Sequence, residues 1–279
     1  MIRQTYLFLL LSVLVMSCSF GSKKEEKATI PEPAAIPRYV EYEVETINEY
    51  LGPCANDSTS KKCLIIQIEY PQITGKVSQP VAECLNENIK RDILATTFLS
   101  DQTESFLDLK TELETDYESV IEEFPDYANS WTVEITSDIL YQDSLFISVA
   151  STVYSYTGGA HPNSGQVYRS YDLRTGEPIG LDDLLKEGYE SSLNEAAEIE
   201  FRMTKEIPPN QSLQDRGYSF ENDRFELNKN FAIINKSLVF YFNPYEIAPY
   251  SLGPTELELR LTDYINLIKE GSVIDDYKN

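Results

Sequence analysis

Histidine is almost absent from this chain of 279 residues, because His161 is its only one. Zinc hydrolases usually gather two or three histidines around the ion, so a single histidine disfavours such a site. A Ser-His-Asp triad needs one histidine, but the chain has no Gly-x-Ser-x-Gly motif and no serine with a reason to be activated. No pair of acids stands out among the 46 present. We therefore expect no catalytic residue, no metal and no cofactor.

Cysteine is also scarce, with four residues and no Cys-x-x-Cys pair, which argues against a structural zinc site or a redox motif. Cys54 and Cys63 flank a polar loop, and this spacing predicts a disulfide in an oxidising compartment. Cys84 falls on a predicted helix, where we expect a buried thiol. Phosphate-binding loops are missing too, because Gly158-Gly159 is followed by Ala-His-Pro and a strand, not by Lys-Ser/Thr.

Basic residues are outnumbered, with 23 Lys and Arg against 46 Asp and Glu and a formal net charge of −23. A chain with this charge repels nucleic acid and anionic lipid headgroups, so we expect no nucleic-acid partner. The charge is compatible with two interpretations, a basic protein partner or ordinary solubility.

Long apolar runs are limited to Tyr6 to Met16, which is too short to cross a bilayer that requires about 20 residues. The run predicts a cleaved export signal over residues 1–17; a membrane anchor helix is the less favoured alternative. Val15-Met16-Ser17-Cys18 resembles a bacterial lipobox, which predicts lipidation of Cys18 and attachment to a membrane by acyl chains. Residues 18–38 are expected to form a tether, and the Lys-Glu-Glu cluster within it indicates either a surface-export signal or a solvated linker. The expected location is the cell envelope, at the outer membrane, with surface exposure as a further hypothesis.

The remaining residues alternate between the two-residue period of strands and the four-residue period of helices. Strands are expected over 38–49, 63–70, 131–135, 145–156 and 166–173, around Phe225, and over 231–234, 238–242 and 257–261. Helices are expected from Pro80, from Ser100 or Asp101 to Phe124, and from Tyr189 to Glu206, with a short helical turn over 181–186. Strands clustered with a few helices, without strict alternation, predict an α+β fold with antiparallel sheet.

Aromatic residues gather at two loops rich in proline and glycine, Tyr156 to Gly165 (YTGGAHPNSG) and Phe242 to Gly253 (FNPYEIAPYSLG). Tyrosine offers a stiff ring with a polar tip, which suits recognition of proteins and carbohydrates. The alternative is that individual tyrosines such as Tyr154, Tyr168 and Tyr171 pack in the sheet, and that Gly158-Gly159 only forms a turn with positive φ.

The same two loops resemble the paired envelope domains of RsiV-type anti-sigma factors, which also precede the catalytic unit of PdaC-type peptidoglycan deacetylases. IEYPQITG (68–75) and YDLRTGEPIGLDDLL (171–185) extend the resemblance over most of residues 40–265. It implies two consecutive α+β subdomains, a PdaC/RsiV-like one over 39–160 and an RsiV-like one over 161–270. The expected ligand-binding residues are Tyr156, Gly158, Gly159, His161, Pro162, Pro244, Tyr245, Pro249 and Tyr250.

The extracellular region of RsiV-type proteins binds lysozyme, so the resemblance implies a basic, lysozyme-like partner or a peptidoglycan fragment. The sigma-binding segment, spanning helix and deacetylase domain of those proteins find no match in this sequence. Three functions therefore stay open: a lipid-anchored binding protein, which we favour; an enzyme or accessory domain acting on cell-wall glycan or peptide; and a structural envelope lipoprotein.

Overall fold

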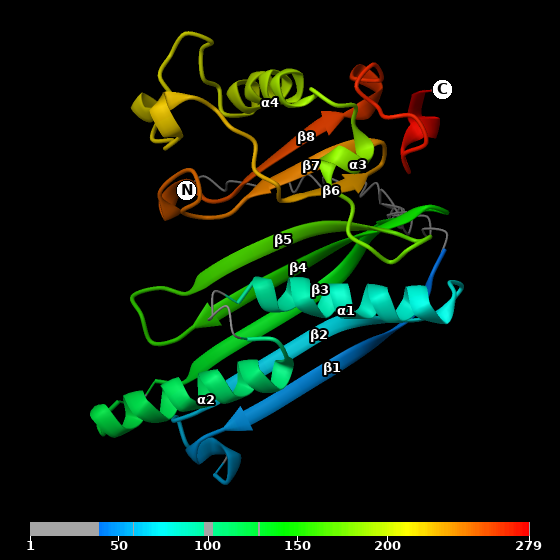
Figure 1. Cartoon of the computed structure of the whole chain (residues 1–279). Coiled ribbons are helices and arrows are strands. Elements are labelled where there is room, and N and C mark those ends of the chain that lie inside the picture. The colour runs from blue at the N-terminus through cyan, green and yellow to red at the C-terminus, as the bar shows by residue number, and fades with distance from the viewer. Residues whose placement is uncertain (1–38, 58, 98–102, 128, 279) are drawn as a thin grey trace, which may run out of the picture. The chain divides into compact units, whose positions relative to one another are not determined.

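The computed structural model describes residues 39–57, 59–97, 103–127 and 129–278, and over these residues the fold is α+β, as predicted (Figure 1). One sheet contains β1 (Glu41–Leu51), β2 (Leu64–Gly75), β3 (Trp131–Gln142), β4 (Phe146–Tyr156) and β5 (Asn163–Asp172). A second contains β6 (Phe231–Ile234), β7 (Ser237–Phe242) and β8 (Thr255–Arg260). The helices are α1 (Gln79–Ala95), α2 (Phe106–Glu123), the short α3 (Leu181–Leu184) and α4 (Glu190–Thr204).

The predicted signal segment, Cys18 and the tether lie outside the described residues, as do Ser100 and Asp101. Within the described part of the chain, none of the helices has the length and apolar character needed to cross a membrane.

The first sheet has the strand order β1-β2-β3-β4-β5, in which β2 and β3 run parallel and all other neighbours run antiparallel. The prediction of an antiparallel sheet is therefore correct except at this one pair. The physical reason is the connection: α1 and α2 lie between β2 and β3 in the chain, and a helical crossover of this kind joins parallel strands. β2 also continues through Pro71 to Gly75, where the sequence predicted its end.

Helices α1 and α2 cover one face of this sheet (Figure 1) and bury the apolar stripes that the four-residue spacing predicted. The core that they form with the sheet includes Leu85, Ile89, Ile93, Leu109, Leu113, Tyr117, Ile66, Ile68, Val133, Ile135 and Val149. Helix α2 begins later than expected, because Ser105 caps it and accepts a hydrogen bond from Asp108 N at 3.1 Å.

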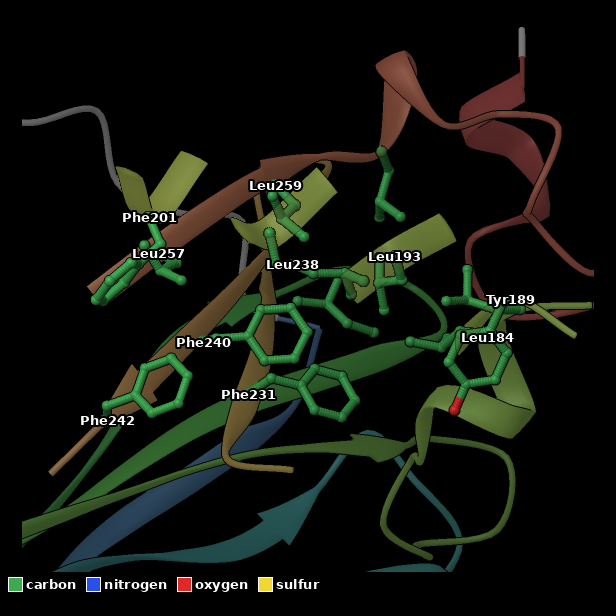
Figure 2. Packing of buried hydrophobic residues seen from close by; sticks show 14 of the residues in the cluster. Leu184, Tyr189, Leu193, Phe201, Phe231, Leu238, Phe240, Phe242, Leu257 and Leu259 are labelled. Carbon is green, nitrogen blue, oxygen red and sulfur yellow. The ribbon is translucent and has the colours of Figure 1, made fainter. Parts of the chain in front are cut away.

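The second sheet is antiparallel, and α4 packs on it through Leu193, Ala197 and Phe201. Figure 2 shows Leu193 and Phe201 in the same cluster as three phenylalanines of the sheet, Phe231, Phe240 and Phe242. Phe146 of β4 belongs to the same core, so the first sheet contributes to the second hydrophobic cluster.

Residue Phe225 is buried at 3% exposure but does not lie in a strand, so the strand expected there is wrong. The backbone of this segment is satisfied by a side chain instead of a neighbouring strand. Asn194 Nδ2 donates to Phe225 O at 2.9 Å, and Leu227 N donates to Asn194 Oδ1 at 2.8 Å. One amide side chain on α4 thus replaces the strand ladder that the apolar sequence suggested.

The two sheets are joined by hydrogen bonds between buried side chains and backbone. Ser148 Oγ lies 2.8 Å from Ser170 Oγ and 2.6 Å from Ile233 O, and Ile233 N donates to Ser170 Oγ at 2.9 Å. The boundary predicted between residues 160 and 161 falls in the connection between β4 and β5, which pair with one another in the first sheet.

The predicted disulfide joins Cys54 to Cys63. Cys84 is a free thiol and is half-buried, less buried than expected, and its Sγ donates to Glu177 Oε1 at 3.5 Å.

Candidate functional site

The loop between β4 and β5 carries His161 and depends on a single glycine. Gly158 has φ +86°, the left-handed region that favours glycine, and a Cβ at this position would lie 1.8 Å from the hydroxyl oxygen of Tyr127. Gly159 has no such requirement, since a Cβ there would meet only the carbonyl oxygen of His161, at 3.7 Å. The Tyr127 hydroxyl in turn accepts a hydrogen bond from Trp131 Nε1 at 3.0 Å, which fixes the ring below the loop.

The loop between β7 and β8 begins with a turn that projects Tyr245. Glu246 N donates to Asn243 O at 3.1 Å and Asn243 N donates to Glu246 Oε2 at 2.8 Å, which leaves Tyr245 at φ +69°. Ile247 and Ala248 anchor the loop, because both are buried in the hydrophobic cluster between α4 and the second sheet. The chain then returns through Pro249 and a short 3-10 turn, Tyr250–Leu252. A tyrosine in the left-handed region is uncommon and costs about 1–3 kcal/mol, which the surrounding contacts must offset.

The two loops meet at three rings, His161, Tyr245 and Tyr250, which we call the aromatic cluster. The rings of His161 and Tyr250 stack with centroids 4.6 Å apart and planes 19° apart. The Tyr245 hydroxyl lies 3.1 Å from His161 Nε2, and the centroids of the two tyrosine rings are 5.6 Å apart. Tyr245 is 58% exposed and Tyr250 38% exposed, so the cluster presents aromatic surface to solvent.

The proton on the imidazole can be placed from its two partners. His161 Nδ1 lies 2.9 Å from the carbonyl oxygen of Pro162, which only accepts hydrogen bonds. Nδ1 therefore carries the hydrogen, and in the neutral ring Nε2 accepts the hydrogen bond that the Tyr245 hydroxyl donates. In the protonated ring Nε2 becomes the donor and the hydroxyl oxygen accepts.

Two asparagines bind the backbone of the edge strand β5: Asn243, at the start of the second loop, and Asn230, which precedes β6. Asn243 Oδ1 accepts from Gln166 N at 2.7 Å, and Asn243 Nδ2 donates to Gln166 O at 3.1 Å. Asn230 repeats the arrangement, since its Oδ1 accepts from Tyr168 N at 2.7 Å and its Nδ2 donates to Gln166 O at 2.8 Å. These bonds satisfy backbone groups on the outer edge of the sheet. We call Asn230 and Asn243 the asparagine pair.

The other tyrosines named from the sequence separate into two groups. Tyr171 is fully buried and donates to Asp92 Oδ2 at 2.6 Å, and Tyr168 is buried and donates to Glu256 Oε2 at 2.7 Å. The pKa of each of these phenols is raised above its usual value, first by burial and second by the adjacent carboxylate. Both rings are structural. Tyr154 is 41% exposed and Tyr156 is half-buried; they share the face of β4 that is turned away from α1 and α2.

The remaining residues predicted for ligand binding frame the cluster. Pro162 supplies the carbonyl that orients His161, Pro249 N-caps the turn carrying Tyr250, and Pro244 precedes Tyr245. Pro249 is exposed, whereas Pro162 and Pro244 are half-buried. The structure thus brings His161, Tyr245 and Tyr250 together and places the prolines around them; their role in binding stays a prediction.

A groove of about 820 Å³ lies elsewhere, between α4 and residues 221–229, and sequence reasoning missed it. The one signal in the sequence is the series of glutamates on the helix from Tyr189. In the described part of the chain, no three His, Cys, Asp or Glu side chains are arranged to hold a metal ion.

Comparison with known proteins identifies the class. Residues 58–164 match the family model of the deacetylase PdaC, and residues 182–262 match that of DUF3298, a protein family of unknown function. The chain therefore shows the paired PdaC/DUF3298 architecture in two consecutive domains, which points to a protein related to the cell envelope. Its similarity to the RsiV-type proteins themselves remains a prediction.

Particular relatives share this architecture in part. The peptidoglycan-N-acetylmuramic acid deacetylase PdaC of Bacillus subtilis is 27% identical over 135 residues, which is 48% of this chain and 28% of the relative. The immunogenic protein MPT64 of Mycobacterium tuberculosis is 27% identical over 116 residues, 39% of this chain and 46% of the relative. The chain thus spans less than half the length of either curated relative.

Solved structures agree with the fold. A DUF3298 family protein from Bacteroides fragilis superposes with a TM-score of 0.66 at 21% identity, covering 86% of this chain and 97% of that one. A DUF3298 family protein from Pseudomonas aeruginosa gives 0.62 at 18% identity, covering 83% and 95%.

Proposed function

We propose that this chain is a binding protein of the cell envelope that recognises a basic, lysozyme-like protein through the aromatic cluster and performs no bond-breaking. The observation that carries the proposal is the stacking of Tyr250 on His161 with Tyr245 hydrogen-bonded to the same imidazole. Exposed tyrosines with a polar tip are typical of the energetically important residues in protein interfaces.

Charge supports a basic partner. The chain carries 46 acidic and 23 basic residues, so a cationic protein is attracted before any specific contact forms. Electrostatic steering of this kind acts mainly on the association rate and weakens as salt is added. Attachment to a membrane through a lipid on Cys18, at the outer membrane, belongs to the same proposal. A Cys18→Ser variant is expected to lose incorporated palmitate and to leave the membrane fraction.

Binding to hen lysozyme, measured by calorimetry at low salt, tests the proposal. Tyr250→Ala and His161→Ala are each expected to weaken binding about tenfold or more, as for a central aromatic contact. Tyr50→Ala is the matched control, because Tyr50 is 52% exposed and lies on β1 in the first sheet. No lysozyme binding by the unmodified chain, or equal losses in all three variants, would contradict the proposal.

A peptidoglycan fragment is the second candidate ligand, and a specific observation favours it. Tyr245, Tyr250 and Tyr154 all expose ring surface, and exposed aromatic rings suit carbohydrate as well as protein recognition. The Bacillus subtilis relative is named for its action on peptidoglycan, which gives this ligand a second line of support. Titration of soluble muropeptides against the same variants distinguishes the two ligands. Turnover of the muropeptide that disappears in His161→Ala would replace the binding proposal with an enzymatic one.

A further inference from the structure

The groove between α4 and residues 221–229, which we call the acidic groove, has a lining that differs from the aromatic cluster. Its apolar surface comes from Leu181 and Leu227, which are half-buried, whereas Leu193 and Phe225 are buried in the core. Its walls carry five carboxylates, Glu190, Glu195, Glu198, Glu221 and Glu226, against two cations, Arg224 and Lys229. Glu198 is paired with Arg202 at 2.8 Å, so four carboxylates and two cations are left for an occupant.

The groove is preformed. Asn194 lies on its wall and binds the backbone of Phe225 and Leu227 at 2.9 and 2.8 Å, which fixes residues 225–227 against α4. Leu193 and Tyr189 come from α4 and the residue before it, and Figure 2 shows both directed into the second core. A binding surface that is ordered before the ligand arrives avoids part of the entropy cost of association.

The chemistry of the lining indicates a cationic polypeptide and not a sugar. Sugar recognition relies on exposed aromatic faces, and both aromatic rings of the groove are covered, Tyr189 at 9% and Phe225 at 3% exposure. What the groove presents instead is the half-buried Leu181 and Leu227 with carboxylates from α4 and from residues 221–226. Lysine side chains suit this combination, because their methylene stems pack on apolar surface while the ammonium group reaches a carboxylate.

One end of the groove is connected to the aromatic cluster. Asn228 lines the groove, and its Nδ2 donates to Glu246 Oε1 at 2.8 Å. Glu246 also accepts from Asn243 N, in the turn that projects Tyr245. We propose that the acidic groove binds an extended, lysine-rich segment of a partner protein, as a second contact surface beyond the aromatic cluster.

Fluorescence anisotropy of the full chain with fluorescein-labelled hexalysine at low salt tests this inference. Glu195→Gln combined with Glu226→Gln removes one carboxylate from each wall and is expected to weaken binding about tenfold, because two ion pairs with the peptide are lost. The matched control is Glu118→Gln combined with Glu122→Gln, two exposed acids of α2 on the first sheet. This control changes the net charge equally and is expected to weaken binding less than about twofold.

A third variant separates the groove from charge. Ser191→Trp places a bulky ring in an exposed wall position without altering any charge, and it is expected to weaken hexalysine binding by a similar factor. Equal weakening by the two double variants, or full binding by Ser191→Trp, would overturn the inference. Tyr250→Ala should leave hexalysine binding unchanged, so failure of the groove and failure of the aromatic cluster give different results.

Discussion

The hydroxyl of Tyr245 lies 3.1 Å from Nε2 of His161, so the only histidine of the chain is bonded to a residue of the second loop. The imidazole is held on its other side as well, because Nδ1 lies 2.9 Å from Pro162 O. A side chain with both ring nitrogens engaged and one face stacked on Tyr250 has little rotational freedom. The aromatic cluster is therefore an ordered surface, which lowers the entropy cost of ligand binding.

This arrangement predicts the tautomer of His161. The neutral ring should carry its hydrogen on Nδ1, because Pro162 O can only accept. Long-range proton–nitrogen NMR spectra report the tautomer directly, and a chain with a single histidine gives one set of signals. Tyr245→Phe removes the donor to Nε2 and should shift the balance toward the Nε2–H form. A ring that is already Nε2–H in the unmodified chain would show that the hydrogen bonds are wrongly placed.

Gly158 and Gly159 should respond differently to the same substitution. Gly158→Ala forces alanine to φ +86° and a Cβ to 1.8 Å from the Tyr127 hydroxyl, so Tyr127 must move and release Trp131 Nε1. The left-handed strain alone is about 1–2 kcal/mol, and we expect a total loss of about 2–4 kcal/mol in the free energy of unfolding. Gly159→Ala is the matched control and should change it by less than about 0.5 kcal/mol. Urea unfolding monitored by Trp131 fluorescence measures both, and equal effects would refute the assigned roles.

The elements of this fold were predictable wherever apolar spacing determines them. The stripe of Leu85, Ile89 and Ile93 predicts α1 because the buried face of a helix recurs every fourth residue. Phe225 was wrongly placed in a strand. An apolar residue among polar ones indicates that the side chain is buried, but it does not show which group forms hydrogen bonds with the backbone. That partner, Asn194, lies 31 residues away, and no local pattern identifies it.

The candidate site was predictable as two loops and not as one surface. Proline and glycine identified residues 156–165 and 242–253 as connections, and their tyrosines predicted that they are binding loops. Their contact depends on the asparagine pair, whose side chains bind backbone of β5 at a distance of 62 to 77 residues. An asparagine next to a strand is typical of a turn, so the sequence did not predict that Asn230 and Asn243 join the two sheets. The two helices between β2 and β3 were predicted, but no local pattern shows that the strands on either side of them are neighbours, so the parallel pair was missed.

The asparagine pair should control both stability and the aromatic cluster. Asn243→Ala removes the acceptor of Gln166 N, and an unsatisfied backbone donor at a partly buried position costs about 1–3 kcal/mol. Because Asn243 also begins the turn that carries Tyr245, the variant should increase hydrogen exchange at Gln166 and weaken ligand binding together. Asn56→Ala, in the turn after Pro53, is the control and should alter neither. Exchange measured by mass spectrometry that stays slow at residue 166 would contradict the assignment.

Buried tyrosines should make the fold sensitive to alkaline pH. Burial, followed by the carboxylate of Asp92, raises the pKa of Tyr171 well above the usual value of 10.0, and burial with the Asp182 hydrogen bond raises that of Tyr189 to about 12. Above about pH 10 these tyrosines ionise in the unfolded chain but stay protonated in the folded one. The unfolded state then binds fewer protons than the folded state, so stability is complete below about pH 10 and falls as the pH rises toward the folded-state pKa.

The expected decline is about 1.4 kcal/mol in the free energy of unfolding for each pH unit and each such tyrosine. Tyr171→Phe should make the decline of the free energy of unfolding shallower by the contribution of one tyrosine between about pH 10 and pH 11.5. At neutral pH the same variant should cost about 1–3 kcal/mol, because Asp92 Oδ2 loses its 2.6 Å donor and keeps the longer contact with Arg169 Nε at 3.4 Å. Tyr50→Phe changes an exposed ring and should leave both the slope and the neutral stability as they are. Urea unfolding at a series of pH values decides the matter: an unaltered slope in Tyr171→Phe would mean that this phenol ionises as readily in the folded chain as in the unfolded one.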